Sequence, residues 1–182
     1  MIGVLVSGEG TNLQALVDSG LPVSAVASSK PGVRALERAQ RAGIPAACFP
    51  LSDHPERAAR DRVMADWLAG HGVELVVCAG FMQLLTPGFL ERFPAINVHP
   101  SLLPAFPGTA PIEEALAAGV AETGVTVHFV DEGVDTGPVI LQEPVAIEAD
   151  DTPASLRERI HAVEHRLLPE AVRLYRSGAL RS

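Results

Sequence analysis

Three polar residues have the types and spacing that suit a reaction passing through an oxyanion. Asn97 and His99 stand two apart in an apolar run, so in a strand both side chains would point to the same side. A neutral amide donor and a titratable imidazole could then stabilise the oxyanion and move a proton. Asp135, in the frame Asp-Thr-Gly-Pro, is the carboxylate that would favour the imidazolium form if it lay close to His99.

The same segments permit plainer interpretations, which the sequence leaves open. His99 could simply cap the proline-rich loop that follows it, and Asp131 and Glu132 are typical of a hydrophilic hairpin turn. His128 alternates with apolar neighbours and is at most a supporting residue. No set of His, Cys and Asp has zinc-ligand spacing, and no Gly-x-Ser-x-Gly elbow exists. We therefore predict neither a metal site nor a serine hydrolase.

A glycine-rich segment, Gly8-Glu9-Gly10-Thr11-Asn12, follows the first apolar run. Backbone N–H groups in a glycine turn that leads into a helix favour a phosphate, and Thr11 and Asn12 could add side-chain hydrogen bonds. Leu13 and Gln14 stand where the dinucleotide fingerprint has its third glycine, and no Walker lysine follows. If the segment binds a ligand, a mononucleotide or sugar phosphate is favoured over NAD or ATP. An equally good interpretation is a tight strand–helix turn that only needs small residues.

Short apolar runs alternate with helical patterns in the first half of the chain. Strands are predicted over residues 2–7, 23–28, 46–49, 74–79 and 95–98. Helices are predicted after residue 12 and over 33–41, 54–68 and 87–93, with Ser52 or Asp53 as the cap of the third. This alternation predicts an α/β fold of three layers, α/β/α, around a mostly parallel, Rossmann-like open sheet.

The second half changes character. Residues 124–130 and 138–147 form two β-like runs that predict an antiparallel hairpin on the sheet edge. A long helix should start at Pro153, with an apolar face made by Leu156, Ile160, Val163, Leu167 and Leu168. No repeat or linker is visible, so we predict one domain over residues 1–182.

Composition excludes several classes of protein. The 182 residues are 47% hydrophobic and 20% charged, which argues against disorder, and the net charge of −8 argues against a nucleic-acid partner. No apolar run approaches the roughly 20 residues that span a bilayer, and no basic region precedes the first one. We expect neither a membrane protein nor a signal peptide. Cys48 and Cys78 are expected to be reduced thiols in a cytoplasmic protein.

Four segments together resemble the folate-dependent formyltransferase family. They are Ser7-Gly8-Glu9-Gly10-Thr11-Asn12-Leu13-Gln14-Ala15, Ala79-Gly80-Phe81-Met82, Asn97-Val98-His99-Pro100-Ser101-Leu102-Leu103-Pro104 and Asp135-Thr136-Gly137-Pro138. The similarity covers nearly the whole chain in the family's order, and the opening segment indicates the branch that acts on glycinamide ribonucleotide. Relatives acting on methionyl-tRNA carry an added C-terminal domain, and formyltetrahydrofolate deformylases an N-terminal one; we expect neither here.

The resemblance implies a transfer of the formyl group from 10-formyltetrahydrofolate, a co-substrate, to the amine of glycinamide ribonucleotide in de novo purine biosynthesis. It implies that Asn97, His99 and Asp135 are catalytic. It also implies that the ribonucleotide is held by Gly10, Thr11, Asn12 and Glu164, and the folate by Arg57, Met82, Gln83, Leu84, Leu85 and Asn97.

Two departures from the family pattern are visible, and several alternatives remain. Gln83 stands where a basic residue is frequent, and residues 108–111 lack histidines found in some relatives. The alternatives are a formyltetrahydrofolate hydrolase, another formyltransferase of the superfamily, a nucleotide-binding regulatory module and a structural paralogue without folate. The expected partners are two small molecules, with no nucleic acid and no membrane. The oligomeric state is left open, a homodimer included.

Overall fold

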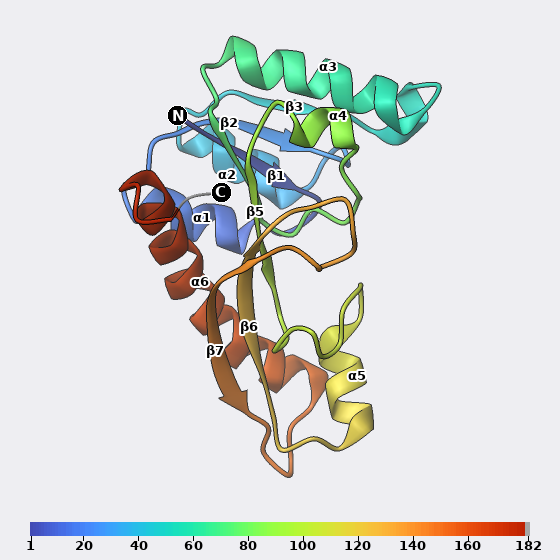
Figure 1. The fold of residues 1–182 in the computed structure, drawn as a ribbon, viewed down its shortest axis with the longest axis vertical. Coiled ribbons are helices and arrows are strands. Elements are labelled where there is room, and N and C mark those ends of the chain that lie inside the picture. The colour runs from blue at the N-terminus through green and yellow to red at the C-terminus, as the bar shows by residue number, and fades with distance from the viewer. Residues whose placement is uncertain (181–182) are drawn as a thin grey trace. The chain divides into compact units, whose positions relative to one another are not determined.

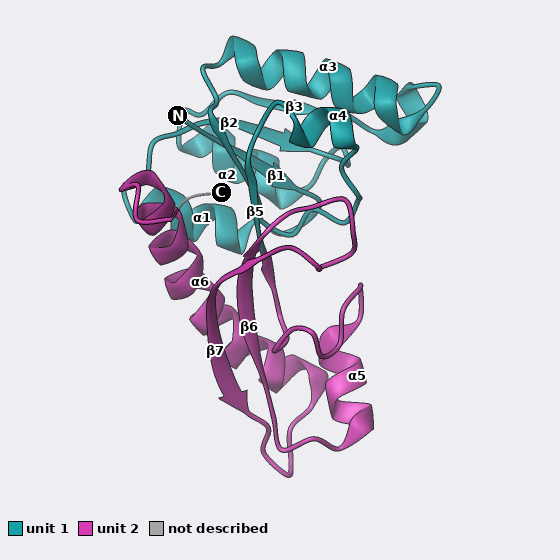
Figure 2. Cartoon of the chain, viewed as in Figure 1, with its two compact units in different colours: residues 1–97 teal, residues 98–182 magenta. Residues whose placement is uncertain are grey.

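The computed structural model describes residues 1–180 and divides them into two compact units. Unit 1 comprises residues 1–97 and unit 2 begins at Val98 (Figure 2). The order of elements follows the expected alternation of strands and helices (Figure 1). The strands form one seven-stranded sheet with hydrogen-bonded order β3-β2-β1-β4-β5-β6-β7. The predicted mostly parallel sheet with an antiparallel edge hairpin is confirmed.

The parallel part of the sheet is built from short, buried strands. Its members are β1 (Ile2–Val6), β2 (Val23–Ser28), β3 (Ala46–Cys48), β4 (Leu75–Cys78) and β5 (Ala95–His99). β1 pairs in parallel with β2 and with β4, and β4 pairs in parallel with β5. All residues of β1 and β4 are buried, as expected for strands covered on both faces. Such strands end in loops that place polar groups at one edge of the sheet.

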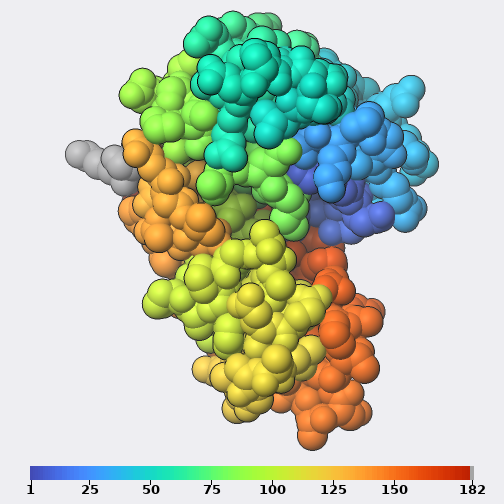
Figure 3. All heavy atoms as spheres, turned by 90° about the vertical axis from the view of Figure 1, so that its right-hand side faces the viewer, coloured from blue at the N-terminus to red at the C-terminus, as the bar shows by residue number. Residues whose placement is uncertain are grey.

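Helices of unit 1 lie on both faces of its strands (Figure 1). They are α1 (Thr11–Asp18), α2 (Arg34–Arg41), α3 (Arg57–Gly70) and α4 (Pro87–Leu90), with a 3₁₀ turn over Leu51–Asp53. α3 packs closely on β1, since a Cβ built on Gly3 would lie 3.0 Å from a methyl carbon of Leu68. Figure 3 shows the outer face of α3 as teal spheres at the surface of unit 1.

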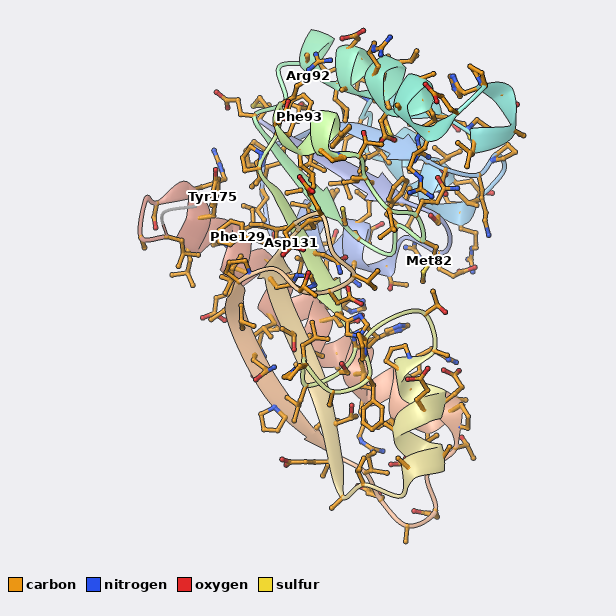
Figure 4. All side chains as sticks on the ribbon, turned by 45° about the vertical axis from the view of Figure 1, so that its right-hand side comes forward. Met82, Arg92, Phe93, Phe129, Asp131 and Tyr175 are labelled. Atoms are coloured by element: carbon orange, nitrogen blue, oxygen red, sulfur yellow. The ribbon has the colours of Figure 1, made fainter. Side chains whose placement is uncertain are left out.

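Unit 2 packs a long helix on a hairpin. Its elements are α5 (Pro111–Ala118), β6 (Glu122–Phe129), β7 (Val139–Ala146) and α6 (Pro153–Arg176). β6 and β7 pair antiparallel, and α6 packs against both. At one end of this layer the rings of Phe129 and Tyr175 meet edge to face, with centroids 5.9 Å apart (Figure 4).

Three details differ from the sequence-based expectations. The cap of α3 is Glu56, without a side-chain hydrogen bond, because Ser52 and Asp53 are taken up by the preceding 3₁₀ turn. The helix α5 was not predicted. On α6, Val163 is only half-buried and Glu164 takes a buried position instead, so the helix face turned inward includes a carboxylate. None of the helices in the described part of the chain has the length and apolar character that a membrane crossing requires.

Candidate active site

His99 ends β5 and is almost fully buried. Its Nε2 atom lies 2.8 Å from the carbonyl oxygen of Phe106, and its Nδ1 atom lies 3.4 Å from Oδ2 of Asp135. Because a backbone carbonyl only accepts hydrogen bonds, Nε2 carries a proton. The other ring nitrogen faces a carboxylate, which also accepts. The ring therefore lies between two acceptors, a carbonyl and a carboxylate, and the predicted His99–Asp135 approach is present.

Asp135 is held between two histidines and a backbone amide. Its Oδ1 atom lies 3.6 Å from Nε2 of His128, and its Oδ2 atom accepts from the N–H of Gly108 at 2.9 Å. Burial raises the pKa of Asp135, but hydrogen bonds from His128 and Gly108 together with the charge of His99 outweigh it. The pKa therefore lies below its usual value, so the group is a carboxylate at neutral pH.

The loop that carries Asp135 is shaped by close backbone packing. Asp131 accepts from the N–H of Gly133 at 3.0 Å and from the hydroxyl of Thr136 at 2.7 Å, which closes a turn. Asp135 itself has φ of 55°, a left-handed conformation that aspartate tolerates better than most residues. A Cβ at Gly137 would overlap the carbonyl oxygen of Phe129. Only glycine fits there, and this contact fixes the direction from which Asp135 enters.

The proline-rich loop after His99 is anchored to the hairpin. Thr126 donates its hydroxyl to the carbonyl of Ser101 at 2.7 Å and accepts from the N–H of Leu103 at 3.1 Å. Gln142 adds a hydrogen bond to the carbonyl of Leu103 at 2.9 Å. The hydroxyl of Ser101 in turn donates to the carbonyl of Ala105 at 2.6 Å. This network holds the loop whose Phe106 carbonyl positions the His99 ring.

Asn97 stands two residues before His99 on the same strand, as the spacing predicted. It pairs with Cys78 in the β4–β5 register and is half-buried, whereas its neighbours Ile96 and Val98 are buried. The alternation of a strand puts Asn97 and His99 on one side of β5. The amide and the imidazole are thus presented along the same strand face.

The glycine segment behaves as a tight turn that opens a helix. Gly10 has φ of 74°, and a Cβ built on it would lie 2.7 Å from Cα of Ala35 in α2. Gly10 is therefore required by helix packing as well as by its backbone conformation. Thr11 and Asn12 begin α1, whose first turn contains no acidic residue. The first N–H groups of a helix lack intrahelical acceptors, so the phosphate interpretation and the turn interpretation are both compatible with this geometry.

A comparison with models of known protein families shows to which family the chain belongs. Residues 1–172 match the model of a family described as "Formyl transferase". The chain belongs to the formyl transferase family. The four segments that carry the resemblance and the His99–Asp135 contact can now be considered as parts of a formyl transferase.

Curated and solved relatives of this formyl transferase extend over nearly all of it. It is 47% identical over 178 residues to the phosphoribosylglycinamide formyltransferase of Mycobacterium tuberculosis, covering 93% of this chain and 81% of that protein. The crystal structure of glycinamide ribonucleotide transformylase 1 from Symbiobacterium toebii superposes with a TM-score of 0.97 at 46% identity, covering 100% of this chain and 89% of that one.

Other relatives of this formyl transferase are much longer. The trifunctional purine biosynthetic protein adenosine-3 of Chironomus tentans is 45% identical over 190 residues, covering 99% of this chain. The chain spans 14% of that protein and 19% of the bovine one. The match is therefore to one part of each trifunctional protein.

The residues that the resemblance assigned to the folate occupy a surface loop and a helix start. Arg57 is the first residue of α3 and is exposed. Met82 and Leu84 are 65% and 44% exposed, and Figure 4 shows Met82 at the edge of its loop. Leu85 is buried, so it belongs to the base of the loop. The loop is tied to the glycine turn, since the N–H of Met82 donates to the hydroxyl of Ser7 at 2.9 Å.

Besides His99 and His128, the buried acidic and basic residues in the described part of the chain are Glu164, Arg60 and Asp61. Glu164 is 5% exposed, and its Oε2 atom lies 4.0 Å from Nε2 of His161. Sequence reasoning missed Arg60 and Asp61, which contact Gln83 and Thr86 in the loop after β4. A signal existed, because Arg60 precedes Met64 and Leu68 at intervals of one helical turn and therefore shares their buried face.

No group of three or more His, Cys, Asp and Glu side chains that could hold a metal ion occurs within residues 1–180.

Proposed function

We propose that residues 1–182 form one formyltransferase domain that transfers the formyl group of 10-formyltetrahydrofolate to the amine of glycinamide ribonucleotide. The products are formylglycinamide ribonucleotide and tetrahydrofolate, in de novo purine biosynthesis. The approach of His99 to Asp135, 3.4 Å between Nδ1 and Oδ2, carries the proposal. A buried imidazole beside a carboxylate supplies both a proton and control of charge. The names of the Mycobacterium tuberculosis and Symbiobacterium toebii relatives support the choice of substrates.

The proposed reaction needs no covalent enzyme intermediate. The amine nitrogen of the ribonucleotide attacks the formyl carbon, and the carbonyl electron pair moves onto oxygen to give a tetrahedral oxyanion. Asn97 donates an amide N–H to this oxygen, and His99 donates to it the Nε2–H that the Phe106 carbonyl accepts in the absence of substrate. When the carbonyl re-forms, the bond between the formyl carbon and N10 of the folate breaks. The proton lost by the amine passes to N10.

Asp135 controls the protonation of the site in this mechanism. Its pKa lies below the usual value, since His128, Gly108 and His99 outweigh the effect of burial, so it stays anionic at neutral pH. An anion at this position holds His99 as the imidazolium, or orders a water that carries the proton from the amine to N10. No metal step is part of the proposal.

Substrate binding is assigned to two groups of residues. The phosphate of the ribonucleotide is held by Gly10, Thr11 and Asn12, with Glu164 contacting the same substrate. Remote binding of this kind fixes the amine in place for attack. The folate is held by Arg57, Asn97 and the loop residues Met82, Gln83, Leu84 and Leu85. The exposed side chains of Met82 and Leu84 support this, because an apolar ring system needs apolar contacts.

We place the reaction in the cytoplasm. Cys48 and Cys78 are both free thiols, which suits a reducing compartment. Burial raises the pKa of Cys78 to about 12, so this thiol stays protonated and unreactive.

A product assay tests the proposal. The purified chain is given 10-formyltetrahydrofolate with and without glycinamide ribonucleotide, and both formylated ribonucleotide and free formate are measured. We expect formylated product only when both substrates are present, and little formate in either case. Formate release without the ribonucleotide would indicate a hydrolase. Folate or ribonucleotide binding without any turnover would indicate a binding module, and either result would overturn the proposed function.

A further inference from the structure

Arg60 and Asp61 form an ion pair in the interior of unit 1. Nε of Arg60 lies 2.6 Å from Oδ1 of Asp61, and the two side chains are 0% and 1% exposed. The second carboxylate oxygen accepts from the backbone N–H of Thr86 at 2.7 Å. Taking two charges out of water is costly, and apolar residues of similar size often serve stability as well or better. The pair is therefore poorly explained by packing alone.

The guanidinium of Arg60 reaches past Asp61 to the loop that the proposed function assigns to the folate. Its Nη1 atom donates to Oε1 of Gln83, and its central carbon lies 5.5 Å from the ring centre of Phe81. Its Nη2 atom is buried and has no hydrogen-bond partner among residues 1–180. The buried guanidinium of Arg60 thus contacts two side chains of the loop, Gln83 and Phe81, and its Nη2 atom makes no hydrogen bond within residues 1–180.

These contacts decide which end of the Gln83 amide faces away from α3. A guanidinium has donors only, so the atom beside it must be the amide oxygen, and the NH₂ group takes the opposite side. Gln83 is half-buried, and Met82 and Leu84 on either side of it are exposed. The loop therefore offers an amide donor between two exposed apolar side chains. A ring system with apolar faces and acceptor atoms on its edge has matching chemistry.

We propose that Arg60 is a positioning residue for the folate: it orients the Gln83 amide so that its NH₂ group donates to an acceptor atom of the folate. The inference rests on the proposed function, because it takes the loop around Gln83 as part of the folate site. Arg60 itself does not touch the reacting atoms. Its effect is confined to folate binding and passes through Gln83.

The Gln83→Glu variant distinguishes folate recognition by the Gln83 amide from a purely structural role of this side chain in the loop. A glutamate keeps the size of Gln83 and accepts from Arg60 even more strongly, so folding is preserved or improved. It has no NH₂ group, however, and turns an acceptor toward the acceptor atom of the folate. We expect the KM for 10-formyltetrahydrofolate to rise roughly tenfold, with the melting temperature maintained and the KM for the ribonucleotide unchanged. A purely structural contact would leave both KM values unchanged.

Arg60→Lys tests the positioning step, with Arg62→Lys as the matched control. Lysine keeps the charge beside Asp61 but is a single ammonium that cannot also hold Gln83 in a fork geometry. We expect the folate KM to rise roughly threefold or more with kcat kept. Arg62 is exposed on the same helix, so the same exchange there should change neither value.

The double variant R60K/Q83M shows whether Arg60 acts through Gln83. Methionine has no amide to orient, so the folate KM of the double variant should equal that of Q83M alone. Independent effects that multiply would overturn the inference, as would an unchanged folate KM in Q83E. These outcomes are distinct from failure of the proposed function, which appears as absent formyl transfer in the wild-type chain. Calorimetry of tetrahydrofolate binding to the wild-type chain shows separately whether a folate site exists.

Discussion

His99 uses both ring nitrogens, and only one of them faces Asp135. Nδ1 lies 3.4 Å from Oδ2 of the carboxylate, while Nε2 is occupied by the carbonyl of Phe106 at 2.8 Å. The first distance exceeds that of a tight charge-assisted hydrogen bond, which is roughly 2.7–2.9 Å. The contact therefore acts mainly through charge, and the ring orientation is set by the loop carbonyl. Because the charge comes from Asp135 and the ring orientation from the Phe106 carbonyl, we expect different effects from substitutions at His99 and at Asp135.

Replacing His99 by alanine should remove the proton donor while leaving the fold intact. We expect kcat to fall roughly 10²- to 10³-fold with both substrates saturating, because one donor to the oxyanion is lost. The variant should still fold, but its melting temperature should fall, because a buried ring and its hydrogen bond with the Phe106 carbonyl are lost. The corresponding exchange at His54, which lies just before α3, serves as the control. Turnover of the H99A variant at the wild-type rate would disprove the role given to this imidazole.

Asp135→Asn should change how stability depends on pH. The pKa of Asp135 is lowered in the folded state because hydrogen bonds from His128 and Gly108 and the charge of His99 outweigh burial. Such a group adds stability that is fully present above its unfolded pKa and lost as the pH falls through its folded pKa. The stability that wild type has over D135N should thus be present at neutral pH and shrink below about pH 5.

Urea unfolding at a series of pH values measures this difference. Asp150→Asn, at an exposed carboxylate, is the matched control and should show no such loss. A difference between wild type and D135N that stays constant into the acid range would contradict the assignment. Turnover gives a second readout, since D135N should also transfer formyl groups more slowly.

The sequence predicted elements and strand faces well, because both follow from local periodicity. Asn97 and His99 were placed on one strand face by their spacing alone, and β5 confirms that placement. The approach of Asp135 to His99 could only be expected from the resemblance. It depends on the left-handed conformation of Asp135 and on the Gly108 amide, which no single-sequence pattern encodes.

The missed features have physical reasons too. The helix α5 buries only Pro111, Ile112 and Ala115, which is too short a stripe to show clear periodicity. Arg60 is buried because the adjacent Asp61 neutralises it and Gln83 in a distant loop accepts a hydrogen bond from it. Charged residues are rarely buried without such partners, so a sequence pattern assigns them to the solvent-facing side of a helix.

Gly137→Ala should disable the site through the backbone. A Cβ at this position would overlap the carbonyl oxygen of Phe129, so the loop carrying Asp135 must shift. A displacement of about 1 Å in a catalytic group can cost on the order of 10²-fold in rate, and we expect kcat to fall by at least tenfold. The control is Gly88→Ala in α4, where a Cβ meets no atom within 4 Å. Equal kcat values for G137A and wild type would show that the loop tolerates the shift.

Thr152→Ala should destabilise the chain without slowing catalysis. Thr152 caps α6 by accepting from the N–H of Ser155 at 3.2 Å, while the Ser155 hydroxyl accepts from the N–H of Thr152 at 3.0 Å. Loss of such a cap costs about 1 kcal/mol of unfolding free energy, measurable as a lower urea midpoint. Thr152→Ser keeps a capping hydroxyl and should restore most of the loss. A fall in kcat without a fall in the midpoint would mean that this end of α6 serves the reaction rather than the fold.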